Sequence, residues 1–561
     1  MRRGVSVVNK KVCSFPILFA LLALLIGTCA VVFPASAQAA PTSTGSITVS
    51  GTVASSYDAY QIFSANVIDG DNDAKIATDL AWVSDAVRDA ALPVLHSAGM
   101  SKSQTTAQEA AEWLNNDSHL TSALSAQLAR SLQSSVAVSE ALKAGTTAEL
   151  PCGYWLIVAD DDAISQGEAG TAPIMVLVGG SAVTVKPKAA TPKVSKHVLE
   201  DSAVAWQKAA DATVGDDLYW RLSATVPAGL AAYDTYAVQF VDTMSAGLDP
   251  SKVAASMRVY VAAGADGGFD AVSAGKDGRA GTEPAKGWTD ITAQCRVSVD
   301  GKTFTVRTGD LIAALGGADA FAAGARVVAV YNAPLNSACN HGIAKGNPNE
   351  VYLRYPRSPF TDQSGDAGFA RTPSDDACAY TWDLALTKRG SDGDKPLAGA
   401  VLSIADDRGR TLAADGTWDA EGKATVTTGE DGRVAVSGVD SGKLEVRELK
   451  APKGYTAFEG TRSVTVKAEG LDVDQVAAAK PKLTITAESP LRADSADGST
   501  GSLEASLINT PTGTPPSIFT GGFMPLTGDM AMFTAAAVAV VGAALIVVAL
   551  LVKRGGGSHK E

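Results

Sequence analysis

The stretch WDLALTK, residues 382–388, alternates apolar and polar side chains in the manner of a β-strand that covers a core. Trp382, Leu384 and Leu386 share one face, because successive side chains of a strand point to opposite sides. Lys388 continues that face, so the pattern places a lysine among apolar side chains. Burying a charged amine is costly unless it is paired or neutralised. We therefore expect Lys388 to have a partner inside the same domain.

Two further strands supply candidate partners. The alternation over residues 444–448 places Glu448 on an apolar face, and the alternation over residues 503–509 does the same for Asn509. Burial disfavours charge, so a buried amine becomes a nucleophile, and a buried carboxylic acid can polarise an amide carbonyl and carry a proton. The set predicts an isopeptide bond between Lys388 and Asn509, formed once with Glu448 as the catalytic acid.

These residues resemble the SpaA-type (Cna-B-like) pilin domain. Its first strand appears as LTK (386–388), its acidic box as VRELKAPKGY (446–455) and its terminal strand as NTP (509–511), while LAGA (397–400) resembles its second-strand pattern. The resemblance implies a prealbumin-type β-sandwich for the last folded domain.

The domain before it repeats the arrangement with a change. Lys196 and Asp242 lie on apolar strand faces, and the resemblance offers them as nucleophile and catalytic acid of a second isopeptide site. The family's terminal Asn is replaced, because alternation along the last strand places Arg357 at the acceptor position. We therefore expect no cross-link here and an Arg357–Asp242 pair, unless Asn347 or Asn349 substitutes. One lost ammonia, about 17 Da, is expected for the whole chain.

The N-terminal region combines strands with a helical segment. Strand-like alternation begins near Ile47 and returns after residue 153, while Ala81–Ala144 shows helical spacing with a capping box that starts at Thr106. The acidic loop 69–73 lacks the Gly and bidentate Glu of an EF-hand, so it is interpreted as a solvated turn.

The region ends in VTVKPK, residues 183–188, where alternation exposes Lys188. This strand resembles the VxVYPK pilin motif of sortase-assembled pili. The resemblance implies that the Lys188 amine is joined to the next subunit, with Lys186 and Lys193 left open as alternatives.

Both ends of the chain carry export signals. Residues 1–39 have the basic start, apolar run and small-residue cleavage site of a secretory signal peptide. Residues 531–552 form an uncharged run long enough to span a membrane, followed by Lys553 and Arg554. Residues 524–528, just before this span, resemble the LPxTG sorting signal. A sortase cuts that signal between Thr and Gly, which are Thr527 and Gly528 here. Residues 524–528 are Met524, Pro525, Leu526, Thr527 and Gly528.

Composition excludes several classes of function. The net charge of −13 argues against a nucleic-acid partner. With no CxxC spacing and five histidines, neither a metal site nor a cofactor is expected. The four cysteines beyond the signal peptide allow three pairings, and we expect a disulfide among Cys295, Cys339 and Cys378 to restrain the middle domain. These four are Cys152, Cys295, Cys339 and Cys378.

The expected fold is mainly β, with tandem immunoglobulin-like, Cna-B-type β-sandwiches of which the first carries a helical insert. The expected divisions are 1–39 signal peptide, 40–190 N-terminal pilin domain, 191–376 second sandwich, 377–511 prealbumin-type domain, 512–530 linker and sorting motif, 531–552 transmembrane helix and 553–561 cytoplasmic tail.

The resemblance implies the backbone subunit of a covalent pilus on a Gram-positive surface, anchored to peptidoglycan after a membrane-bound precursor stage. Its implied partners are pilin-specific and housekeeping sortases, identical subunits and a host-surface ligand. The alternatives are a monomeric wall-anchored adhesin and an accessory tip or basal pilin. No nucleophile elbow, zinc motif or phosphate loop indicates an enzyme.

Overall fold

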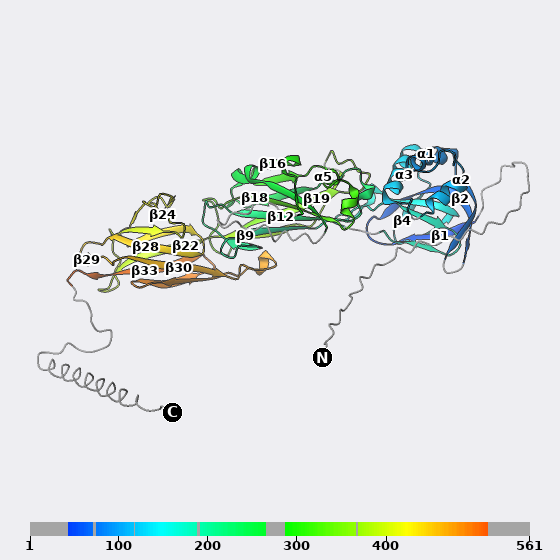
Figure 1. Ribbon diagram of the computed structural model, residues 1–561. Coiled ribbons are helices and arrows are strands. Elements are labelled where there is room, and N and C mark those ends of the chain that lie inside the picture. Colours follow the sequence, from blue (N-terminus) through cyan, green and yellow to red (C-terminus); the bar gives the residue numbers. More distant parts are fainter. Residues whose placement is uncertain are drawn as a thin grey trace, which may run out of the picture.

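The computed structural model contains three folded bodies in a row, which we name the N-terminal, middle and C-terminal domains (Figure 1). It describes residues 43–70, 74–116, 118–187, 191–264, 287–365 and 368–513. The predicted signal peptide, Lys188, the sorting motif with Thr527 and the predicted span 531–552 lie outside the described residues. Within the described part of the chain, no helix is both long and apolar enough to cross a membrane.

The N-terminal domain is a β structure with three helices, as the sequence predicts. The strands are β1 (Thr44–Val49), β2 (Ser56–Asp69), β3 (Lys75–Trp82), β4 (Glu140–Lys143), β5 (Thr147–Pro151), β6 (Gly153–Ala159), β7 (Ile174–Val178) and β8 (Val183–Val185). The helices are α1 (Asp85–Ser97), α2 (Ala107–Leu114) and α3 (Ser122–Ser135). One sheet has the order β5-β1-β8 and the other β3-β2-β6-β7, with β4 beside β2.

The helical insert is confirmed, with a shorter extent than predicted. Helical spacing was expected to Ala144, but α3 ends at Ser135 and residues 140–143 pair with β2. The predicted capping box is present at α2, where Thr106 Oγ1 accepts from Glu109 N at 3.2 Å and the Glu109 carboxylate accepts from Thr106 N at 3.0 Å. Residues 140–143 form a strand instead of a helix because they pair with β2, and this tertiary contact overrides their helical spacing.

The middle domain is a sandwich of two sheets. One has the order β10-β9-β12-β18-β14-β15 and the other β11-β21-β19-β13-β17-β16, with β20 beside β19. The first sheet contains β9 (Val194–Glu200), β10 (Ala205–Gln207), β12 (Tyr219–Val226), β14 (Arg258–Ala263), β15 (Thr289–Asp290) and β18 (Ala325–Asn332). The second contains β11 (Ala209–Asp211), β13 (Gln239–Met244), β16 (Arg296–Asp300), β17 (Thr303–Arg307), β19 (Asn347–Pro356), β20 (Phe369–Arg371) and β21 (Asp375–Tyr380). Short helices α4 (Val253–Ser256) and α5 (Leu311–Ala314) connect strands.

The C-terminal domain is also built from two groups of strands. The first contains β22 (Trp382–Gly390), β27 (Arg433–Val439), β29 (Tyr455–Thr456), β32 (Leu491–Asp497) and β33 (Ser502–Pro511). The second contains β23 (Val401–Ala405), β24 (Thr411–Leu412), β25 (Trp418–Asp419), β26 (Val426–Thr427), β28 (Gly442–Lys450), β30 (Thr461–Glu469) and β31 (Lys482–Ala487). The first strand, β22, pairs in parallel with the last, β33, so the two ends of the domain lie side by side.

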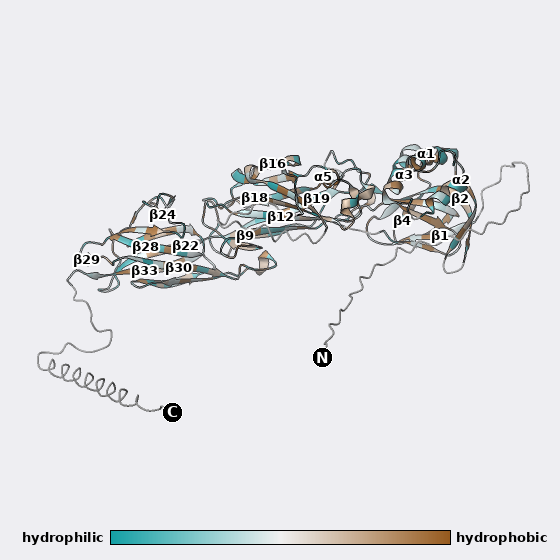
Figure 2. Cartoon of the chain, viewed as in Figure 1, coloured by the Kyte–Doolittle hydropathy of each residue, from teal (hydrophilic) through white to brown (hydrophobic). Residues whose placement is uncertain are grey.

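Apolar (brown) and polar (teal) residues are both present along the strands of the three domains (Figure 2). One apolar core lies in the middle domain around Trp220, Phe240 and Tyr331, each fully buried. Another lies in the C-terminal domain around Trp382 and Leu402, also fully buried. Each side chain that alternation turns inward therefore enters a water-poor interior.

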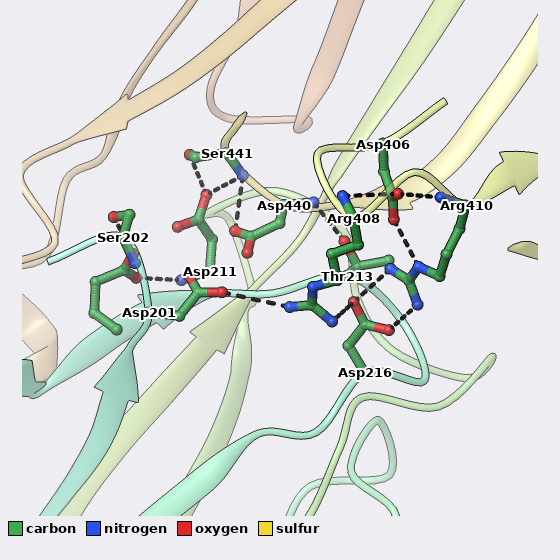
Figure 3. A network of polar contacts seen from close by, with 11 residues as sticks. Asp201, Ser202, Asp211, Thr213, Asp216, Asp406, Arg408, Arg410, Asp440 and Ser441 are labelled. Carbon is green, nitrogen blue, oxygen red and sulfur yellow. Dashed lines mark hydrogen bonds and ion pairs between the residues drawn. The ribbon is translucent and has the colours of Figure 1, made fainter. Parts of the chain in front are cut away.

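A polar network joins the middle and C-terminal domains (Figure 3). Asp216 of the middle domain accepts from Arg410 Nη1 at 2.5 Å and from Arg408 Nη1 at 2.8 Å. Asp211, at the end of β11, accepts from the indole N–H of Trp382 at 2.5 Å and from Ser441 N at 3.0 Å. The middle and C-terminal domains are thus held together by charged hydrogen bonds and by a buried hydrogen bond.

Candidate functional site

The C-terminal domain brings together the three residues that alternation predicted to be buried. Lys388 on β22, Glu448 on β28 and Asn509 on β33 have exposed fractions of 0%, 7% and 2%. Lys388 Nζ lies 3.5 Å from Glu448 Oε1, and Asn509 Nδ2 donates to the two Glu448 oxygens at 2.9 and 3.0 Å. The parallel pairing of β22 with β33 places the amine and the amide at one end of the same ladder.

The surroundings of Lys388 favour a reactive amine. Burial lowers the pKa of Lys388 to about 8, and the nearby Glu448 carboxylate opposes that fall. About a tenth of such amines are neutral at pH 7. Asn509 presents its amide nitrogen to Glu448, whereas we expected the carbonyl to face the acid. The carboxyl group therefore contacts the nitrogen that would leave as ammonia.

The middle domain places Lys196 and Asp242 in a second buried polar set. Both side chains are fully buried, and Lys196 Nζ donates to Asp242 Oδ2. The Tyr331 hydroxyl accepts from Lys196 Nζ at 2.8 Å and donates to Asp242 Oδ2 at 3.0 Å. Burial lowers the pKa of Lys196 to about 8 and raises that of Asp242, while the attraction between the two groups opposes both shifts. Burial thus favours the neutral form of each member of the pair.

Asn349, and not Arg357, completes this set. Asn349 lies at the start of β19, is fully buried and donates from Nδ2 to the Tyr331 hydroxyl at 2.8 Å, the same oxygen that Lys196 contacts. Within the described structure, Asn349 Oδ1 and Asp242 Oδ1 are buried atoms without a hydrogen-bond partner.

The predicted Arg357–Asp242 pair is wrong. Arg357 follows the end of β19, its backbone oxygen accepts from Gly170 N at 2.7 Å, and its charge acts on Asp161 of the N-terminal domain. Counting alternation backwards from Val351, instead of forwards, would have reached Asn349. Asn347 is also fully buried, but its amide bonds the backbone of Asn340.

The strand that was predicted to carry a pilin motif has its described side chains on the faces that alternation predicted. β8 pairs in parallel with β1; Val185 at its end is buried, and Lys186, the next residue, is exposed. Ser181, which lies just before β8, donates its backbone N–H to the Asp69 carboxylate at 2.8 Å. Lys186 lines a cleft of about 510 Å³ between the N-terminal and middle domains. Lys193, the other alternative to Lys188, is exposed at the start of the middle domain.

The predicted disulfide is wrong. All four cysteines lie among the described residues, and all four are free thiols. Cys295 donates to the carbonyl of Ile291, Cys339 contacts His341, and Cys378 is buried on β21. A disulfide needs two Cβ atoms about 3.8 Å apart, and the fold positions each thiol against a different partner. Among the described residues no cluster of metal-ligating side chains is present.

Comparisons with known proteins place part of the chain in a known domain family. Residues 383–480 match the SpaA family model, described as a prealbumin-like fold domain. The trypsin-resistant surface T6 protein of Streptococcus pyogenes serotype M6 is 30% identical over 143 residues, which are 24% of this chain and 24% of that relative. The chain thus matches about a quarter of the relative's length.

Two solved structures are similar at low scores. The T6 backbone pilin of serotype M6 Streptococcus pyogenes has a TM-score of 0.45 at 16% identity, covering 84% of this chain and 98% of that one. The full-length major pilin SpaD of Corynebacterium diphtheriae has a TM-score of 0.40 at 15% identity, with coverage of 84% and 98%. Both scores are below 0.5. The family match covers the part of the chain that carries Lys388 and Glu448.

Proposed function

We propose that the chain is the structural backbone subunit of a covalently polymerised pilus on a Gram-positive surface. The observation that carries this proposal is the buried Lys388–Glu448–Asn509 set, which spans the first and last strands of the C-terminal domain. A second such set in the middle domain and the SpaA match over residues 383–480 support it.

In the C-terminal domain, neutral Lys388 Nζ attacks the side-chain carbonyl carbon of Asn509. The new C–N bond forms as the C–Nδ2 bond breaks, and the proton lost by Nζ passes through the Glu448 carboxyl to Nδ2, which leaves as ammonia. Glu448 already accepts from Nδ2 at 2.9 Å, so it is placed to carry that proton. Each bond forms once, so this self-modification does not make the chain an enzyme.

In the middle domain, Lys196 attacks Asn349 with Asp242 as the acid. Asp242 Oδ2 contacts the amine, while Tyr331 holds amine and amide through one hydroxyl oxygen. A protonated Asp242 can donate from Oδ1 to the Asn349 carbonyl, and both of these oxygens lack a hydrogen-bond partner among the described residues. We therefore expect the whole chain to lose two ammonias, one from each domain, and not the single ammonia that the sequence predicted.

Such bonds suit a chain that carries tension. A bond from β22 to β33 joins the first and last strands of the C-terminal domain, so a pull along the chain passes through covalent bonds and not through ladder hydrogen bonds. Neighbouring subunits would be joined by a sortase, through the carbonyl of Thr527 and the amine of Lys188, and the last subunit transferred to peptidoglycan. The protein would be a membrane-bound precursor before that step.

Immunoblotting of cell-wall extracts boiled in SDS and reductant tests the proposal. Wild type is expected to give a ladder of high-mass species, and Lys188→Ala is expected to collapse it to monomer. Lys186→Ala and Lys193→Ala are the matched controls and should keep the ladder. A single band in every strain would instead indicate a monomeric wall-anchored adhesin or an accessory pilin.

A further inference from the structure

A thiol, an imidazole and a carboxylate meet where the middle domain faces the C-terminal domain. Cys339 and His341 lie in the loop after β18, and Asp383 lies on β22. Cys339 Sγ is 3.5 Å from His341 Nε2, and His341 Nδ1 is 2.8 Å from Asp383 Oδ2. We name these three residues the Cys339 triad. Neither isopeptide site uses any of them.

The surroundings of the Cys339 triad fix its carboxylate and its loop. Asp383 Oδ1 accepts from Ser437 Oγ at 2.6 Å and from Gly438 N at 3.1 Å. The loop passes so close to the C-terminal domain that a Cβ on Gly342 would lie 2.5 Å from Gly501 N, and Gly342 has a φ of +73°. Glycine is therefore required next to His341. The two domains together hold the imidazole between thiol and carboxylate.

The geometry allows a proton to move from Cys339 to His341. Burial raises the pKa of the Cys339 thiol, and the Asp383 charge adds to that rise, so a thiolate without a neighbouring cation is disfavoured. Transfer of the proton to Nε2 supplies that cation. Nδ1 makes no directed hydrogen bond to any described residue, and its 2.8 Å contact with Asp383 becomes an ion pair once the ring is protonated. The carboxylate thus stabilises the imidazolium.

We propose that Cys339 is a nucleophilic thiol that exchanges with small soluble disulfides, with His341 as its base and Asp383 as a positioning residue. The Cys339 proton moves to His341 Nε2, and the sulfur attacks one sulfur of the disulfide. The new S–S bond forms as the old one breaks, and the leaving thiolate takes the proton from His341. The Cys339 sulfur is oxidised and the leaving sulfur is reduced, so the small disulfide is the oxidant and the step balances. Cys339 is only half-buried, whereas Cys152 and Cys378 are buried.

The same chain contains its own reference thiol. Cys295 is half-buried like Cys339, but its Sγ donates to the carbonyl of Ile291 at 3.3 Å, and burial raises its pKa to about 11. Cys152 and Cys378 are buried. Cys295 thus matches Cys339 in exposure and differs in lacking an imidazole contact.

The test measures the rate at which dithiodipyridine labels each cysteine of the full chain, purified in detergent, between pH 5 and pH 9. Peptide mass spectrometry assigns the label to Cys339 or Cys295. For Cys339 we expect a labelling rate at pH 7 that is at least about tenfold above the rate of Cys295. His341→Gln should remove this advantage and bring the Cys339 rate close to that of Cys295.

Asp383→Asn should lower the Cys339 labelling rate without moving the reaction to Cys295, and Ser437→Ala should have a smaller effect in the same direction. The proposal is overturned if Cys339 and Cys295 share one rate and one pH profile, or if His341→Gln leaves the Cys339 profile unchanged. It is also overturned if Cys339 is found in an intramolecular disulfide in protein purified without reductant. The labelling rates of Cys339 and Cys295 in the wild-type chain test the proposal even where a variant fails to fold.

Discussion

Replacing Asn349 with Ala removes the acceptor that we assign to the middle domain. The wild-type chain should weigh about 34 Da less than its sequence mass, because two ammonias are lost, and Asn349→Ala should be short by about 17 Da. The remaining deficit belongs to Lys388 and Asn509. Asn347→Ala is the matched control, since Asn347 is equally buried on the same strand but bonds only backbone groups. This control should keep the full deficit.

The effect on stability follows from the loop that the bond closes. Lys196 and Asn349 enclose about 150 residues, and the chain-entropy treatment of cross-links gives about 5 kcal/mol for a loop of that length. The lost hydrogen bond from Asn349 to Tyr331 adds about 1 kcal/mol. For a domain of this size the melting temperature should fall by roughly 10–20 °C.

The measurements are intact mass after reduction and a calorimetric melt of the purified chain. Reduction removes any mass difference that comes from disulfides. A wild-type deficit of a single ammonia would refute the assignment of Asn349. So would an Asn349→Ala variant that still loses two. Asn347→Ala should destabilise the middle domain by the cost of its buried hydrogen bonds alone, without a change in mass deficit.

Three further predictions concern single side chains. Glu448→Gln should prevent or greatly slow the bond from Lys388, so the mass deficit should fall to one ammonia, and a rapid, complete second loss would contradict the proton-carrying role of Glu448. Burial, with the Asp211 charge, raises the pKa of Glu200 to about 7, so the folded protein holds a proton there that the unfolded chain releases near pH 4.5. The free energy of unfolding should therefore fall as pH rises from about 4.5 to 7, by up to about 1.4 kcal/mol per pH unit, and Glu200→Gln should flatten that part of the curve measured by urea unfolding. Thr106→Ala removes the N-cap of α2 and should cost about 1 kcal/mol in the same assay, with Thr105→Ala as the neutral neighbour.

Much of the C-terminal site could be predicted from sequence, because each of its residues is defined by alternation along one strand. Lys388, Glu448 and Asn509 each continue an apolar face, and the structure buries all three. The same reasoning placed Val185 inward at the end of β8 and Lys186 outward directly after it. What alternation could not give was which atom of Asn509 faces Glu448, since that depends on a side-chain rotation inside the core.

The middle site needed the tertiary structure. Alternation along the last strand fits both Asn349 and Arg357, and the sequence alone does not say which end of that strand meets Asp242. The register does, because Asp242 pairs with Val351 and Met244 with Asn349, so the start of β19 lies beside the acid. Tyr331, which bridges amine and amide, comes from the opposite sheet and carried no sequence signal.

The sequence by itself determined the strand faces, the helical insert and the outward position of Lys186, since these depend on the period of neighbouring residues. Tertiary structure alone decided the acceptor Asn349, the four free thiols and the contact of His341 with Asp383. Each of these depends on the distance between atoms that belong to different strands or domains. That distance is set by sheet register and domain docking, which local periodicity does not encode.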